Sequence, residues 1–384
     1  MHIVPPLASL PPLALYVHIP WCVRKCPYCD FNSHESRQIP EAEYIIALLQ
    51  DLQQDRHLAQ GRSIGSIFFG GGTPSLFSAA SYDRLLQSIN QIVPISTHAE
   101  ITLEANPGTF EYEKFSGFYQ AGINRLSIGV QSFDGNQLQA LGRIHNREEA
   151  INAIRAARHV GFDKLNIDLM HGLPQQTVAS ALNDLQQAID LEPSHLSWYQ
   201  LTIEPNTVFY NKPPRLPDDD DLGNIEDAGK ALLHAQGFQQ YETSAYAKPG
   251  FQCAHNLNYW RFGDYLAIGA GAHGKITVLD SGEISRYQKT RLPQDYLNSE
   301  KPFTARQEHV AKQDLAFEFF MNALRLQEAI PKSLFTQRTG LPVATVADTI
   351  QHAVEQGLLE NHQDYWRTTE LGQRFLNTLL NLFQ

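Results

Sequence analysis

Three cysteines near the start of the chain carry the clearest chemical signal in the sequence. Cys22, Cys26 and Cys29 follow a Cys-x-x-x-Cys-x-x-Cys spacing, and the whole chain holds four cysteines. Three thiolates on one short loop can hold three irons of a [4Fe–4S] cluster and leave the fourth iron open to an exchangeable ligand. A structural zinc site needs a fourth protein ligand, usually from a second pair, and no such pair follows. The spacing predicts a cluster at residues 22–29, with free thiols as the alternative.

Other residues suited to ligand binding follow short apolar segments farther along the chain. A glycine run at residues 70–72 precedes Thr73, and such a run lets a ligand approach the backbone and its free N–H groups. Glu104 and Asp168 are suited to an ammonium group or to ribose hydroxyls, and Arg143 is suited to a carboxylate. Gln131 closes a further apolar segment. Taken singly, each of these residues is more typical of a cap or a loop anchor.

The segments that must position these residues alternate between strand and helix patterns. Strands are predicted at residues 15–19, 66–69, 101–105, 125–130, 164–169 and 195–201. Helices are predicted at residues 41–60, 81–92, 111–120, 148–160, 177–191 and 222–235. This β-α repetition predicts an α/β fold with parallel strands and right-handed crossovers, as a barrel or an open sheet. The polar residues above then gather at the carboxyl ends of the strands, where α/β barrels carry their active sites.

A second unit begins near residue 300. Helices are predicted at residues 313–326, 330–339 and 343–356, followed by a hairpin at 358–369 and a helix at 370–383. We therefore predict two domains, residues 1–298 and 299–384, the second α-rich and winged-helix-like. Residues 301–384 hold eight Lys and Arg against nine Asp and Glu, with no basic recognition helix. A lid or interaction role is therefore favoured over DNA binding.

Composition narrows the function classes further. A formal net charge of −11 over 384 residues disfavours nucleic-acid and anionic-membrane partners. Four prolines interrupt the apolar first fifteen residues, which is not typical of a signal peptide. No run approaches the roughly 18 apolar residues of a membrane-spanning helix. We expect a cytoplasmic protein in a reducing compartment, with peripheral membrane contact left open.

The cysteine motif has an aromatic residue, Tyr28, before its last cysteine, and in this form it resembles the signature of the radical S-adenosylmethionine (SAM) superfamily. Gly70-Gly-Gly-Thr-Pro resembles the segment of that superfamily that receives the methionine amino group. From Tyr16 to about residue 380, the pattern resembles the oxygen-independent coproporphyrinogen III oxidase group. The resemblance implies a partial (β/α)6 barrel with a C-terminal domain, and a SAM molecule that chelates the open iron. It implies that the cluster is bound by Cys22, Cys26 and Cys29, and that SAM is bound by Tyr16, Tyr28, Gly71, Gly72, Thr73, Glu104, Gln131, Arg143 and Asp168.

Two sequence features separate the oxidases of this group from its haem chaperones. The oxidases carry a further cysteine two residues after the third, where this chain has Phe31, and a longer segment before the cluster loop. The stretch from His255 to Trp260, His-Asn-Leu-Asn-Tyr-Trp, matches one associated with haem binding in the chaperones. A histidine can ligate haem iron, and Tyr259 and Trp260 can pack on a porphyrin. Without the resemblance, ordinary packing is the favoured interpretation of these residues. Cys253 is an alternative ligand.

We therefore expect a protein that binds haem at His255 and passes it to acceptor proteins, with a cluster and SAM as its other cofactors. The alternative is a radical SAM oxidase that acts on a porphyrinogen. A third hypothesis is a SAM-gated interaction protein without haem. His18, His171 and His273 lie beside predicted strand ends or glycine turns and are interpreted as structural.

Overall fold

The computed structural model describes residues 9–108 and 111–384, and a 12-stranded sheet dominates it. Six parallel strands form the centre of this sheet: β1 (Leu13–Ile19), β4 (Ile64–Gly71), β5 (Ile95–Ala105), β6 (Arg125–Gln131), β7 (Lys164–His171) and β8 (His195–Gln200). All seven residues of β6 are buried, as expected for a parallel strand covered on both faces. The six predicted strands are confirmed, with ends that differ by one or two residues except at β5, which begins six residues earlier than predicted.

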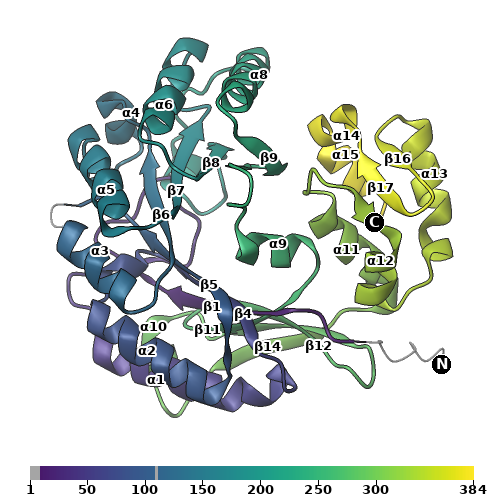
Figure 1. Cartoon of the computed structure of the whole chain (residues 1–384), viewed down its shortest axis with the longest axis horizontal. Coiled ribbons are helices and arrows are strands. Elements are labelled where there is room, and N and C mark those ends of the chain that lie inside the picture. Colours follow the sequence, from purple (N-terminus) through teal and green to yellow (C-terminus); the bar gives the residue numbers. More distant parts are fainter. Residues whose placement is uncertain (1–8, 109–110) are drawn as a thin grey trace.

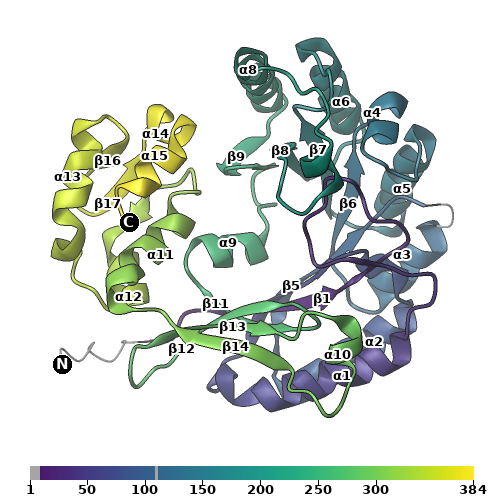
Figure 2. The same ribbon diagram turned by 180° about the vertical axis from the view of Figure 1, so that it is seen from behind.

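Antiparallel strands extend the sheet on both sides. Beyond β1 lie β11 (Asp264–Ile268), which is parallel to β1, and then β12 (His273–Thr277), β13 (Ile284–Lys289) and β14 (Thr304–His309). Beyond β8 lie β10 (Ala245–Ala247) and β9 (Gln239–Glu242). The sheet therefore ends at β14 and β9, and it curves into a partial barrel that is open between those two strands (Figures 1 and 2). The cysteine loop adds a separate short pair, β2 (Trp21–Cys22) and β3 (His34–Glu35).

Helices cover the outer face of the curved sheet (Figure 1). The longer ones are α1 (Glu41–Asp55), α2 (Ala79–Ile92), α3 (Glu111–Gln120), α5 (Arg147–Val160), α6 (Val178–Asp190) and α8 (Asp219–Ala235). Shorter segments are η1 (Arg56–Ala59), η2 (Pro74–Leu76), α4 (Gly135–Ala140), α7 (Val208–Asn211), α9 (Ala254–Trp260) and α10 (Pro293–Tyr296). α9 lies on the inner side of the sheet.

Local sequence explains where several helices begin and end. Asn146 and Thr177 form capping boxes at the first turns of α5 and α6, because each side chain accepts a hydrogen bond from the third helical N–H. α5 ends at Gly161, whose φ of 109° suits glycine. The acidic run at residues 218–221 caps and begins α8, where carboxylates favour the positive end of the helix dipole.

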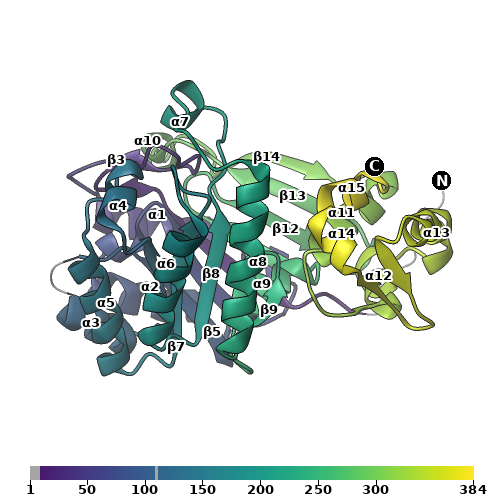
Figure 3. The ribbon, with the colours of Figure 1, turned by 90° about the horizontal axis from the view of Figure 1, so that it is seen from above.

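The C-terminal residues form a separate domain beside the barrel (Figure 3). Its elements are η3 (Lys312–Asp314), α11 (Leu315–Ala323), β15 (Ile330–Pro331), α12 (Lys332–Thr339), η4 (Val343–Val346), α13 (Ala347–Glu355), β16 (Leu359–Asn361), β17 (Tyr365–Thr368), α14 (Glu370–Arg374) and α15 (Leu376–Asn381). The expected hairpin is present as β16 and β17, while the expected last helix is interrupted at Phe375. β14 pairs with β13, so the main sheet continues past residue 298, where the sequence had placed the boundary.

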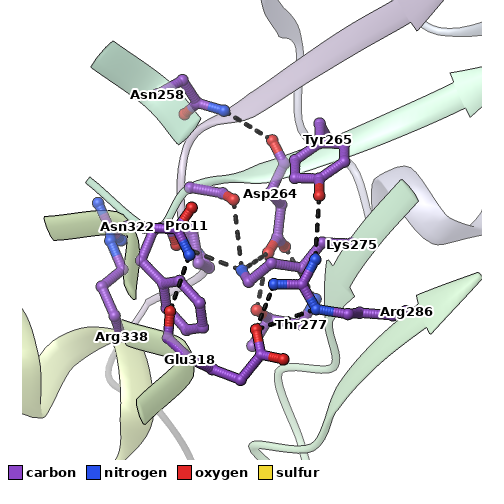
Figure 4. A network of polar contacts seen from close by, with 12 residues as sticks. Pro11, Asn258, Asp264, Tyr265, Lys275, Thr277, Arg286, Glu318, Asn322 and Arg338 are labelled. Atoms are coloured by element: carbon purple, nitrogen blue, oxygen red, sulfur yellow. Dashed lines mark hydrogen bonds and ion pairs between the residues drawn. The ribbon is translucent and has the colours of Figure 1, made fainter. Parts of the chain in front are cut away.

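Two hydrophobic cores are joined by a polar network. One core lies between the sheet and its outer helices, and the other lies within the C-terminal domain and includes Phe262 and Ile284. Between them, Asp264 accepts hydrogen bonds from Lys275 and Thr277 (Figure 4). Among the described residues, no helix has the length and apolar character needed to cross a membrane.

Candidate functional site

A cavity of about 430 Å³ inside the curved sheet collects most of the residues that the sequence had singled out. Its size is typical of a small-molecule site. The predicted residues on its wall are Cys22, Cys26, Tyr28, Cys29, Gly71, Gly72, Thr73, Glu104, Gln131, Arg143 and Asp168. Tyr16 lines a second cavity of about 450 Å³, which shares Phe31, Gly71 and Glu104 with the first. His255 lines neither cavity.

Each thiol of the cysteine loop is close to a polar side chain, and two of these side chains come from distant parts of the chain. The Thr73 hydroxyl donates to Cys22 Sγ at 3.6 Å, and Arg143 Nη1 donates to Cys26 Sγ at 3.6 Å. Cys29 Sγ lies 3.6 Å from the Ser33 hydroxyl. Burial raises the pKa of Cys22, and the hydrogen bond from Thr73 opposes that shift. Donors aimed at sulfur stabilise thiolates, which are the form that binds iron.

The glycine run brings the end of β4 against the cysteine loop. A Cβ at Gly72 would lie 2.4 Å from the Trp21 carbonyl oxygen, and Gly71 has a φ of 120°. Both positions therefore require glycine. Because the two segments pack so closely, Gly72 N donates to the Ile19 carbonyl and Thr73 N donates to the Trp21 carbonyl, at 2.8 and 2.7 Å. This contact brings the Thr73 hydroxyl within hydrogen-bonding distance of Cys22 Sγ.

Two carboxyl groups face the middle of the cavity. Burial, and then the charge of Asp168, raise the pKa of Glu104 to about 8, against a hydrogen bond from Gly71 N at 3.3 Å. Burial also raises the pKa of Asp168, which accepts hydrogen bonds from Ser127 at 3.0 Å and Asn166 at 2.7 Å. Glu104 is therefore largely protonated near pH 7 in the ligand-free cavity, and an ammonium group there would favour its ionised form.

Arg143 and Gln131 are held in place by other polar groups. Arg143 Nη2 donates to Asn106 Oδ1 and to the Gly129 carbonyl, both at 2.6 Å. Gln131 has a φ of 72°, which is uncommon for a residue other than glycine, and its side-chain oxygen accepts a hydrogen bond from Tyr199 at 2.8 Å. Arg143 therefore already donates hydrogen bonds to groups of the protein. Only part of its guanidinium is left to bind a ligand carboxylate, which is less than the sequence suggested.

Sequence reasoning missed several polar residues on the cavity wall, namely Thr102, Asn106, Arg125, Ser127, Asn166 and Tyr199. Three of the six, Thr102, Ser127 and Asn166, lie within strands, two or four residues before a residue that the sequence had singled out. Ser127 precedes Gln131 in this way, and Asn166 precedes Asp168. Side chains two residues apart on a strand share a face. These residues could therefore have been predicted by counting back every second residue from each strand end.

His255 lies in α9 and is 3% exposed. Its Nδ1 lies 3.1 Å from the Ser66 hydroxyl, and its Nε2 has no partner among the described residues. The ring packs 5.1 Å from the rings of Phe68 and Tyr259, measured between centroids. Burial lowers the pKa of His255 to about 3, so its imidazole is neutral.

The two aromatic residues of the His255–Trp260 stretch lie in different surroundings. Tyr259 lines the second cavity. Trp260 lies under the Arg325 guanidinium of the C-terminal domain, at 5.1 Å from the ring. Cys253, the alternative ligand, lines the first cavity, and burial raises the pKa of its thiol to about 12.

The comparisons with known families agree with this geometry. Residues 16–186 match the Radical SAM superfamily, and residues 310–375 match the HemN C-terminal domain. The coproporphyrinogen III oxidase HemN from Escherichia coli, a radical SAM enzyme, has a similar fold, with a TM-score of 0.82 over 97% of this chain and 90% of its own, at 24% identity. A radical SAM fold with a HemN-type C-terminal domain is therefore the class to which the structure conforms.

More similar proteins narrow the class to a family. The chain is 56% identical to a protein of Haemophilus influenzae named heme chaperone HemW, over 98% of this chain and 99% of that protein. It is 53% identical to the Escherichia coli protein of the same name, over 98% and 99% of the two chains. The chain belongs to the HemW family.

Proposed function

We propose that this protein is a haem chaperone of the cytoplasm that binds haem, passes it to acceptor proteins and carries a SAM-ligated [4Fe–4S] cluster. The single observation that supports the cluster most strongly is that Cys22, Cys26 and Cys29 share one cavity wall and each meets a polar group there. The names of the HemW relatives support the haem role. We also propose that the domain boundary falls after His309, the end of the main sheet.

The residues of the cavity fit the groups that this function requires. Cys22, Cys26 and Cys29 would hold the cluster, and the wall residues Tyr28, Gly71, Gly72, Thr73, Glu104, Gln131, Arg143 and Asp168, with Tyr16 from the second cavity, would hold SAM. When bound, the cluster and SAM supply an open iron and one-electron chemistry. Thr73 and Arg143 would hold the thiolates, and Glu104 and Asp168 would receive an ammonium group or hydroxyls.

The haem ligand that we propose is His255. A neutral imidazole with Nδ1 held by Ser66 leaves Nε2 as the ligating atom, because the partner of one ring nitrogen fixes the role of the other. Since His255 is buried, α9 must shift before haem can bind there.

The test is anaerobic reconstitution with iron and sulfide, followed by haem titration and analysis for oxidised porphyrinogen. We expect about one haem per chain, since one such stretch is present, and no decarboxylated product. His255→Ala should weaken haem binding or shift the Soret band while leaving the cluster intact. His352→Ala, at an exposed position in α13, is the control and should change neither.

Three outcomes would contradict this proposal. Decarboxylation over several turnovers would assign the chain to the porphyrinogen oxidases. No Soret band on titration would favour a SAM-gated interaction protein. Unchanged haem spectra and affinity in His255→Ala would move the ligand elsewhere, with Cys253 the next candidate.

A further inference from the structure

The cavity continues past the predicted site toward the amino ends of the strands. Its wall there includes Thr102 and Arg125, which face each other across β5 and β6 in the sheet register. Arg125 begins β6 and Gln131 ends it, so the two lie roughly 20 Å apart along the strand at the usual rise per residue. The Thr102–Arg125 end is therefore opposite the cysteine loop.

Both of these residues bury a polar group that has no partner. Arg125 is 1% exposed, and its Nη1 donates to the Phe251 carbonyl at 3.1 Å. Its Nη2 has no hydrogen-bond partner in the part of the chain that the structure describes, and neither has the hydroxyl of Thr102, also 1% exposed. A buried donor without an acceptor destabilises the fold, because it has lost its hydrogen bonds to water and gained none. Two such groups on one cavity wall indicate a missing acceptor.

The charges around Arg125 leave a net positive charge. Its carboxylate partner, Glu100, lies 3.6 Å from Nη1 but also pairs with Lys164 at 3.1 Å. Glu100 further accepts a hydrogen bond from Ala254 N, at the first turn of α9, at 2.7 Å. One carboxylate thus faces two cations. An anion can therefore enter this end of the cavity without an added counter-charge.

The neighbouring titratable groups do not change this balance. Burial, and then the charge of Arg125, hold the pKa of His195 well below its ordinary value, so its ring is neutral. Both of its nitrogens are engaged, by Asn166 at 2.6 Å and by Tyr241 at 2.8 Å. The Cys253 thiol is protonated, because burial raises its pKa to about 12. Neither group competes with Arg125 for an anion.

We propose that Arg125 and Thr102 form a carboxylate-binding subsite at the inner end of the cavity. A carboxylate accepts one hydrogen bond at each oxygen, which matches the guanidinium Nη2 and the hydroxyl of Thr102. This proposal rests on the proposed function, because the carboxylate belongs to a propionate of haem. The methionine end of SAM is instead expected on the open iron of the cluster, at the opposite end of the cavity.

The test removes the carboxylate from each ligand in turn. Affinities of the reconstituted protein are compared for haem against haem dimethyl ester, and for SAM against decarboxylated SAM. For haem, losing the propionate charges should weaken binding by about 10- to 100-fold in the wild type. Arg125→Lys, which keeps a charge beside Glu100, should abolish most of that difference. Thr102→Val, close in shape, should reduce it by about 3- to 10-fold.

Thr368→Val is the matched control. Thr368 in β17 also has a buried hydroxyl without a partner in the described chain, but it lies in the C-terminal domain. The control should leave both ligand comparisons unchanged. Arg125→Lys and Thr102→Val should alter the haem comparison alone, and a change confined to the SAM comparison would overturn the propionate subsite.

Equal carboxylate dependence of haem binding in the wild type, Arg125→Lys and Thr102→Val would overturn the subsite. Absence of haem uptake by the wild type would instead overturn the proposed function. Metal-free protoporphyrin and its dimethyl ester, which need no iron ligand, then test the subsite alone, so the two failures are distinguishable.

Discussion

At the scale of single residues, the cysteine loop depends on groups that are distant in the sequence. Thr73 and Arg143 reach Cys22 and Cys26 from the ends of other strands and loops, and only Ser33, beside Cys29, is local. Each of the three sulfurs therefore has a polar neighbour, while burial raises the pKa of Cys22 against the hydrogen bond from Thr73. Because only three thiols line this loop, each one is needed as an iron ligand of the proposed cluster.

The first prediction concerns these three cysteine ligands. Cys22→Ser, Cys26→Ser or Cys29→Ser should each prevent stable cluster assembly, because a serine hydroxyl replaces one of three thiolates. Iron and labile sulfide are measured after anaerobic reconstitution. Cys253→Ser is the control, because this residue lies among Arg125 and Asn256 rather than on the loop, and it should keep full occupancy. Four irons bound in any loop variant would refute the cluster assignment.

The second prediction concerns pH and His171. Burial lowers the pKa of His171 to about 4, and its ring packs 4.3 Å from that of Trp198. The unfolded chain takes up a proton at this residue near pH 6.5, whereas the folded chain does not until about pH 4, so stability falls as pH falls between these values. Between pH 7.5 and 5, the free energy of unfolding should fall by about 2 kcal/mol more in the wild type than in His171→Gln.

Urea unfolding at both pH values measures this difference. His352→Gln, on the exposed face of α13, should show the same pH dependence as the wild type. A His171→Gln protein with an unaltered pH dependence would mean that His171 titrates normally in the fold.

The residues found from the sequence were those with a strong type or motif. Cysteine spacing, the glycine run, and Glu104 and Asp168 at strand ends were all visible, and the structure gathers them at one cavity. Arg125 and Thr102 were not visible, because each lies inside a strand whose facing direction depends on register. An arginine at the start of a strand is ordinarily exposed, and only the fold shows that this one is buried.

At the scale of elements, α9 is held from two sides. Ser66 of β4 contacts His255, and Glu100 of β5 accepts from Ala254 N. From the C-terminal domain, Glu328 pairs with Arg261 at 2.8 Å, just after the helix. The sequence identified this stretch by its residues, but it did not predict a short helix inside the barrel, because seven residues carry too little periodicity.

The third prediction is that Ser66→Ala loosens α9. Removing the hydroxyl leaves Nδ1 of His255 buried without a partner, at a cost of about 1–3 kcal/mol. Amide hydrogen exchange across residues 254–260 should become faster. Ser285→Ala is a matched control, because Ser285 in β13 also lies 3.1 Å from a histidine Nδ1, that of His309 in the neighbouring strand β14. Equal exchange across α9 in both variants would show that Ser66 does not hold the helix.

At the scale of the whole molecule, the barrel and the C-terminal domain meet around β11 to β13 (Figure 4). Lys275 donates to Asp264 and to the carbonyls of Phe262 and Gly263, and the Phe262 ring packs against Phe319 of α11. Arg286 pairs with Glu318 of the same helix. The β-α repetition predicted the first unit and the run of helices before a hairpin predicted the second, but these ion pairs depend on tertiary contacts that no local pattern could indicate.

The last prediction concerns Asp264, which is fully buried where the barrel meets the C-terminal domain. It pairs with Lys275 at 3.1 Å and with Arg62, beside β4, at 2.7 Å. Asp264→Asn keeps the shape but leaves the buried Lys275 without a counter-charge. Unfolding by urea, followed by tryptophan fluorescence, should show a loss of about 3–5 kcal/mol, as when one partner of a buried pair is removed.

Asp295→Asn supplies the control for Asp264. Asp295 pairs with Lys301 at 2.7 Å, but both side chains are exposed by a third or more, so its loss should cost at most about 1 kcal/mol. Because Lys275 also lies 4.1 Å over the Phe262 ring, Asp264→Asn should unfold the C-terminal domain and the edge of the barrel together. A variant as stable as Asp295→Asn would mean that apolar packing alone holds the two units against each other.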